Sequence, residues 1–177
     1  AYFYYKFGCK NKIFNVTVPI YLIFSSPQPI DEEKERSLSL KDKFIVGIGG
    51  ILVNMVLGII GIIVIKNIDI ASGNLIHFFI YTFTLFHFVE AASYAVLNNI
   101  IPASDIIYIQ EYKPLYRVPI FILGLIFVYF IISLINNSPD NWRYGLIITT
   151  IILSLLMGLL RVALGYLIKK KEEGKAK

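Results

Sequence analysis

Residues 44–65 read FIVGIGGILVNMVLGIIGIIVI and carry no charged side chain. A helix of about 20 apolar residues is long enough to cross the hydrocarbon core of a bilayer. A helix also satisfies its own backbone hydrogen bonds, as the interior of a membrane requires. The stretch therefore predicts a transmembrane helix.

Further apolar blocks follow this stretch along the chain. They cover residues 75–97 with one acid, Glu90, residues 118–135 without a charge, and residues 145–168 with one base, Arg161. We therefore expect a mainly α, polytopic integral membrane protein with four transmembrane helices over residues 44–168. A basic tail, residues 169–177, follows this domain.

The composition agrees with this prediction. Of the 177 residues, 56% are hydrophobic and only 16% are charged, whereas an ordinary soluble domain has roughly 25% charged residues. These values exclude a water-soluble enzyme, a disordered chain and a collagenous chain. A single cysteine, Cys9, excludes a disulfide framework and any multi-cysteine metal cluster.

The basic residues that give the chain its net charge of +5 lie beside the apolar blocks. Four spans put the N-terminal segment, residues 98–117 and the tail on one side, which carries Lys6, Lys10, Lys12, Lys34, Arg36, Lys41, Lys43, Lys113, Arg117, Lys169, Lys170, Lys171, Lys175 and Lys177. The other side carries Lys66 and Arg143. The positive-inside rule then predicts that both ends are cytoplasmic. The charges are topology signals, so we expect a lipid bilayer as partner and no nucleic acid.

Residues 1–43 differ from the rest and form a membrane-proximal N-terminal segment. Residues 13–18 and 20–24 are rich in β-branched and aromatic side chains and flank Pro19. This pattern is typical of two short β-strands or one bent edge strand. Residues 31–43 form a charged connector that can begin a helix.

The first apolar block has one unusual face. Gly50, Asn54, Gly58 and Gly61 fall within about 80° of one another on a helix. Small residues at this spacing are common where membrane helices approach closely, with Asn54 as a polar bridge. The alternative is that Asn54 presents its amide to a substrate backbone.

The second block carries His87 and Glu90 three residues apart, so both lie on one helix face. Ionisable groups within a membrane span face the protein interior or a water-filled cavity. A buried hydrogen-bonded pair is the favoured interpretation, and a zinc site is the alternative because imidazole and carboxylate both bind zinc.

The segment from Asn99 to Asp105 follows the second block. Pro102 predicts a helix break, Asn99 can satisfy carbonyls that the break frees, and Asp105 can cap the next helix. The functional alternative is an unwound membrane segment that delivers Asp105 as a ligand or acid.

The order of these features resembles the site-2 protease family of intramembrane zinc metalloproteases. Residues 1–9, AYFYYKFGC, resemble the stretch that follows the second histidine of the family's His-Glu-x-x-His helix, with Ala1 directly after that histidine. Strands near the membrane come next, and residues 13–24 are similar. Gly50-x-x-x-Asn54 resembles the family's hairpin signature, and Asn99-x-x-Pro102 resembles the first half of its Asn-x-x-Pro-x-x-x-x-Asp-Gly motif.

The chain departs from the family pattern in two places. The His-Glu-x-x-His segment does not occur in the 177 residues, so we expect a fragment of a longer protein. The family's zinc-binding aspartate falls on Ile107 and its glycine on Tyr108, while Asp105 lies two residues earlier. Either Asp105 is the third zinc ligand across a shorter loop, or the ligand has been lost.

The resemblance implies an enzyme that cleaves membrane-embedded peptide bonds in transmembrane protein substrates with zinc as cofactor. It implies Asp105 as the metal ligand and Gly50, Asn54, Asn99 and Pro102 as substrate-binding residues, while the chain alone is expected to be inactive. One alternative is a pseudoprotease that binds membrane segments without cutting them. A second alternative is a small transporter or channel subunit with His87, Glu90 and Arg161 along its path.

Overall fold

The computed structural model describes residues 2–11, 13, 30–67, 74–102 and 105–156. The predicted strands fall almost entirely on residues 14–24, outside the described residues. The basic tail and the second half of the fourth apolar block, residues 157–168, also lie outside them. Within the described ranges every regular element is a helix.

Two short helices precede the long apolar ones. α1 (Tyr2–Lys6) is followed by Gly8, whose φ of 74° allows the backbone N–H groups of Gly8 and Cys9 to donate to carbonyls of the last turn. This left-handed ending is the Schellman motif, in which glycine has no side chain to clash. α2 (Glu32–Ser37) begins at Asp31, whose carboxylate accepts from the backbone N–H of Lys34.

The long helices agree with the apolar blocks. They are α3 (Leu40–Asn67), α4 (Leu75–Ala92) continued by the π-helix η2 (Ser93–Leu97) and by α5 (Asn98–Ile100), and α7 (Arg117–Asn136). α6 (Asp105–Tyr112) and the 3₁₀ turn η3 (Pro114–Tyr116) connect α5 to α7. A further helix covers residues 140–156.

Among the described residues, three helical segments are long and apolar enough to cross a membrane: Leu40–Asn67, Leu75–Ile100 and Pro114–Asn136. In each, less than half of the most apolar window is buried inside the protein, so many large apolar side chains face outward, as on a helix surrounded by lipid. These helices indicate a membrane protein. The predicted fourth span begins inside the helix at residues 140–156 and extends beyond the described residues.

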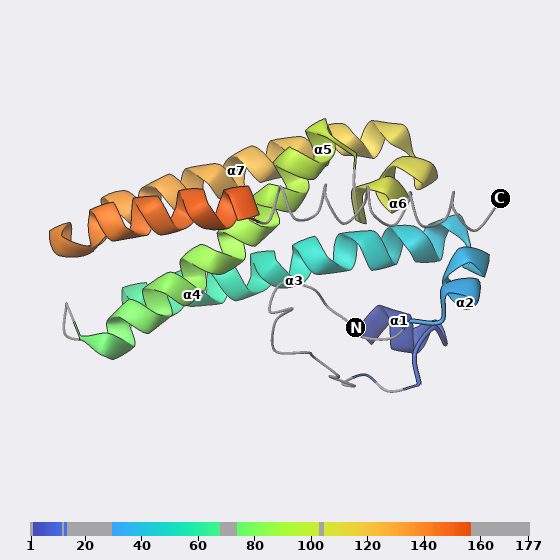
Figure 1. The fold of residues 1–177 in the computed structure, drawn as a ribbon, viewed down its shortest axis with the longest axis horizontal. Coiled ribbons are helices and arrows are strands. Elements are labelled where there is room, and N and C mark those ends of the chain that lie inside the picture. The colour runs from blue at the N-terminus through green and yellow to red at the C-terminus, as the bar shows by residue number, and fades with distance from the viewer. Residues whose placement is uncertain (1, 12, 14–29, 68–73, 103–104, 157–177) are drawn as a thin grey trace.

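α4 lies between α3 and α7 and packs against both (Figure 1). The core between these helices contains Phe88, which is fully buried and stacks on Phe130 of α7 at 5.2 Å between ring centroids. α6 folds back onto α3, where Tyr112 lies 4.9 Å from the ring of Phe44. This packing places α6, which begins at Asp105, beside α3.

Candidate functional site

Glycines bring α3 and α4 into close contact. A Cβ atom added to Gly58 would lie 2.8 Å from the ring of Phe88, and one added to Gly61 would overlap the hydroxyl of Thr84 and lie 2.8 Å from its Cβ. Both distances are too short for real side chains, so these glycines permit the close approach. We call this contact, made by Asn54, Gly58 and Gly61 of α3 with Thr84, His87 and Phe88 of α4, the glycine seam.

Asn54 is the polar bridge of the glycine seam, as its spacing predicts. Its side chain is buried, and its Oδ1 lies 2.7 Å from Nδ1 of His87. An amide oxygen can only accept a hydrogen bond, so Nδ1 of His87 carries the proton and donates it. The amide nitrogen of Asn54 has no hydrogen-bond partner among the described residues. Gly50, placed on the same face by the sequence, is partly exposed.

The hydrogen bond of His87 therefore crosses to α3 instead of joining His87 to Glu90 on its own helix. Phe83 and Phe86 enclose the imidazole, with ring centroids at 4.4 and 5.6 Å. With its proton on Nδ1, a neutral imidazole keeps an acceptor at Nε2.

The predicted helix break lies close to Pro102. Ile101 adopts an extended backbone with φ −111° and ψ 95°, the conformation that a following proline favours, and the helix ends at Ile100. Pro102 is exposed. The proline therefore shapes the turn that leads to α6.

Asn99 is buried beside this break and binds Arg117 at the start of α7. Its Nδ2 donates to the carbonyl of Arg117 at 2.8 Å, and its Oδ1 accepts from Nε of Arg117 at 2.9 Å. A third hydrogen bond joins the guanidinium to the backbone carbonyl of Asn99. Asn99 was expected to satisfy carbonyls freed by the break, but its partner lies 18 residues later because the chain reverses here.

Glu35 connects three segments that are far apart in sequence. Its Oε1 accepts hydrogen bonds from the hydroxyls of Tyr4 in α1, at 2.7 Å, and Tyr108 in α6, at 2.6 Å. Sequence reasoning missed Glu35 because it is one of several acids in a charged connector. We call Glu35, Asn99, Tyr108 and Arg117, with the turn that they hold, the polar corner.

Cys9 and Lys10 lie close to this connector. The backbone N–H of Asp31 donates to the carbonyl of Cys9 at 2.9 Å. Burial raises the pKa of the Cys9 thiol, and the charges of Glu35 and Asp31 raise it further. Burial also lowers the pKa of Lys10, whose buried Nζ has no hydrogen-bond partner among the described residues.

The described residues do not fit a zinc ion by themselves. No group of three or more His, Cys, Asp or Glu side chains that could hold a metal occurs among them. Asp105, the predicted ligand, is the first residue of α6, and the structure describes its backbone position without its side-chain surroundings. Ile107, at the position of the family aspartate, is 41% exposed.

Comparisons with known proteins leave the chain without an identified relative. No family model matches it, no curated protein is similar to it in sequence, and no solved structure resembles it. The geometry of the chain therefore carries the functional argument.

Proposed function

We propose that this chain is the membrane-embedded part of an intramembrane zinc endopeptidase of the site-2 protease type, acting on transmembrane protein substrates in the bilayer. In this proposal both ends are cytoplasmic, as the fourteen-to-two distribution of basic residues favours. The resemblance puts a His-Glu-x-x-His segment immediately before Ala1, so the general base and two zinc ligands would come from residues that precede this sequence.

The meeting of α1 and α6 at Glu35 is the observation that carries the proposal. Tyr4 and Tyr108 donate to the same carboxylate oxygen, so Glu35 links α1 to α6 through their side chains. Three residues span about 4.5 Å along a helix. Asp105 begins α6 three residues before Tyr108, so in this proposal Glu35 ties the helix that carries the aspartate ligand to α1.

The two asparagines have different parts in this proposal. Asn54 uses only its carbonyl oxygen within the protein, so its amide nitrogen is the group that can donate to a substrate carbonyl. Asn99 uses both ends of its amide on Arg117. Asn99 and Pro102 would therefore position the segment that leads to Asp105, while Gly50 would leave space beside Asn54 for a substrate backbone.

The coding sequence upstream of Ala1 gives the first test. We expect an in-frame His-Glu-x-x-His that ends at the residue before Ala1. A start codon at this point would remove the proposal of a protease.

The complete gene product gives the second test. Purified full-length protein should contain about one zinc per chain and cleave a transmembrane substrate, and Asp105→Ala should lower both zinc content and cleavage. Asp140→Ala is the matched control, because its carboxylate is 92% exposed and pairs with Arg143 near the end of α7. Full zinc content and full cleavage in Asp105→Ala would remove Asp105 from the metal site.

A non-catalytic protein that binds membrane helices is the second candidate. The complete engagement of Asn99 with Arg117 favours it, since a residue that the family resemblance gives to substrate has a structural role here. Capture of a transmembrane substrate by full-length protein without cleavage, unaffected by a chelator, would support this candidate over the peptidase.

A further inference from the structure

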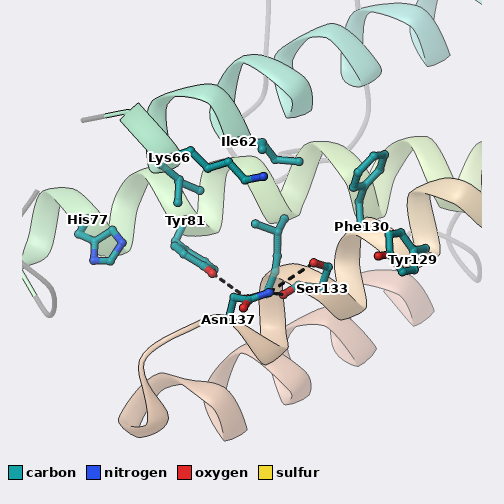
Figure 2. Close-up of a pocket in the computed structure, with 10 residues that line it drawn as sticks. Ile62, Lys66, His77, Tyr81, Tyr129, Phe130, Ser133 and Asn137 are labelled. Carbon is teal, nitrogen blue, oxygen red and sulfur yellow. Dashed lines mark hydrogen bonds between the residues drawn. The ribbon is translucent and has the colours of Figure 1, made fainter. Parts of the chain in front are cut away.

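A cavity of about 520 Å³ lies between the end of α3, the beginning of α4 and the end of α7 (Figure 2). Lys66 reaches it from α3, His77 and Tyr81 reach it from α4, and Tyr129, Ser133 and Asn137 reach it from α7. Pockets of about 300–1,000 Å³ are typical of small-molecule sites. The cavity is separate from the polar corner, which lies where α4 ends and α7 begins.

The charge of the lining favours an anion. Lys66 is a cation, and none of the described residues that line the cavity has a carboxylate. Asp140 is the first acid after α7, and its carboxylate already pairs with Arg143 at 2.8 Å. An anion that entered would therefore meet one positive charge and no repelling negative charge from the described lining.

The lining also offers hydrogen-bond donors that the protein leaves unused. Lys66 has three donors and no ion pair or hydrogen bond among the described residues. The buried Nδ1 of His77 has no partner within the described part of the chain. The amide nitrogen of Asn137 donates to the carbonyl of Ser133 at 2.8 Å and to its Oγ at 3.4 Å. The Ser133 hydroxyl therefore acts as an acceptor here, and its own proton can be donated to a ligand. Tyr81 is already committed, because its hydroxyl donates to the carbonyl of Leu134.

The place of the cavity along the helices indicates the kind of anion. Lys66 is the second-last residue of α3, and His77 is the third residue of α4. Trp142 packs on His77 at 5.1 Å, and Tyr129 is 66% exposed. Trp and Tyr gather at the level of lipid headgroups, so an anion at this depth can be a headgroup phosphate.

We propose that this cavity binds a phosphate group through Lys66 and Ser133 at the membrane surface. The phosphate belongs either to a lipid headgroup or to a soluble phosphate compound, and both present the same oxygens to these donors. This site is independent of the proposed peptidase and requires no metal.

The only tryptophan of the chain, Trp142, makes the proposal measurable. Its fluorescence should change on binding, because its ring contacts His77 in the cavity lining. The full chain, purified in a neutral maltoside detergent, is titrated with dihexanoyl phosphatidic acid, with dihexanoylglycerol, which lacks the phosphate, and with inorganic phosphate.

We expect saturable binding of the phosphatidic acid, weakened about tenfold in Lys66→Gln, because a charge-assisted hydrogen bond is lost. Lys66→Arg should keep most of the affinity, and Lys41→Gln should keep all of it, since Lys41 lies at the opposite end of the same helix and is also exposed. Both glutamine variants remove an exposed charge from one helix, so their folding is comparable.

The titrations also distinguish the two sources of the phosphate. Binding of phosphatidic acid alone assigns the site to lipid headgroups, and competition by inorganic phosphate assigns it to soluble phosphate compounds. Equal binding by dihexanoylglycerol, equal affinity in Lys66→Gln, or no binding by the unaltered chain would overturn the proposal.

Discussion

The glycine seam and the polar corner hold helices together by different means. In the glycine seam, missing side chains at Gly58 and Gly61 let α4 approach α3, and one hydrogen bond joins the two helices at Asn54. In the polar corner, three hydrogen bonds join Asn99 to Arg117. The glycine seam therefore depends mainly on shape, and the polar corner depends mainly on polar groups.

This difference separates two asparagines that the sequence alone treats alike. Asn54 is held at one atom by His87 and keeps its amide nitrogen for another partner. Asn99 is held at both ends of its amide and at its backbone carbonyl. In the proposed peptidase, Asn54 would therefore contact the substrate and Asn99 would hold the turn.

Loss of the guanidinium at the polar corner should have the largest effect on stability. Arg117→Met keeps the length of the side chain but removes its donors, which leaves the Oδ1 and backbone carbonyl of buried Asn99 without partners. We expect a loss of about 3 kcal/mol in the free energy of unfolding, measured by denaturant titration in detergent.

Arg143→Met is the control for this prediction. Arg143 pairs with the exposed Asp140 and donates to the carbonyl of Asn136 at 3.2 Å. Exposed pairs contribute about 0–1 kcal/mol. Equal losses in the two variants would show that the polar corner does not depend on its hydrogen bonds.

A methyl group added to the glycine seam should have the second-largest effect. In Gly61→Ala the new Cβ would meet Thr84, a β-branched side chain with little freedom to move away. We expect a loss of about 2 kcal/mol, as for overpacking in a close-packed core.

Gly145→Ala is the matched control for Gly61→Ala. A Cβ atom at Gly145 meets nothing within 4 Å, although this residue also lies in a helix. Alanine favours helix by about 1 kcal/mol over glycine, so this variant should keep or gain stability. A loss in Gly145→Ala as large as that in Gly61→Ala would mean that shape does not hold the glycine seam.

The sequence predicted the glycine seam better than the polar corner for a physical reason. Asn54, Gly58 and Gly61 recur at helical spacing, so a regular helix places them on one face before any tertiary contact is known. All three are buried in the structure. The length of the apolar runs predicted four spans, and three of these blocks lie in described helices that are long and apolar enough to cross a membrane.

The polar corner depends on contacts that no spacing rule describes. Pro102 predicted the break, but the pairing of Asn99 with Arg117 arises only after the chain turns through α6 and η3. Glu35 lies 73 residues before Tyr108 and shares a hydrogen bond with it. The π-helix η2, which lies against Gly124 of α7, also had no signal in the apolar pattern.

Loss of the one hydrogen bond of the glycine seam should lower the free energy of unfolding by less than either substitution above. Asn54→Leu and His87→Phe should each cost about 1 kcal/mol, with a coupling free energy of about 0.6 kcal/mol in a double-mutant cycle, as for other hydrogen bonds between membrane helices. The control is Thr82→Val, because the hydroxyl of Thr82 donates only to carbonyls of its own helix, Phe78 and Phe79. A coupling near zero would leave Asn54 without a positioning partner in the seam.

The smallest expected effect is on the reactivity of the Cys9 thiol, which lies near Glu35 on the N-terminal side of the polar corner. Cys9 is 1% exposed, and burial together with the charge of Glu35 raises its pKa. Since the thiolate is the nucleophile, alkylation by iodoacetamide at neutral pH should be slow and should rise with pH to a midpoint above that of an ordinary thiol.

Glu35→Gln removes the charge and keeps an oxygen that can accept from Tyr4 and Tyr108. The pKa of Cys9 should then fall, and alkylation at neutral pH should become a few-fold faster. Glu33→Gln is the control, because Glu33 is exposed on the same helix and is not among the charges that raise the pKa of Cys9. Equal acceleration in both variants would point to a general charge effect, whereas acceleration confined to Glu35→Gln would mean that the carboxylate that joins α1 to α6 also controls the thiol beside it.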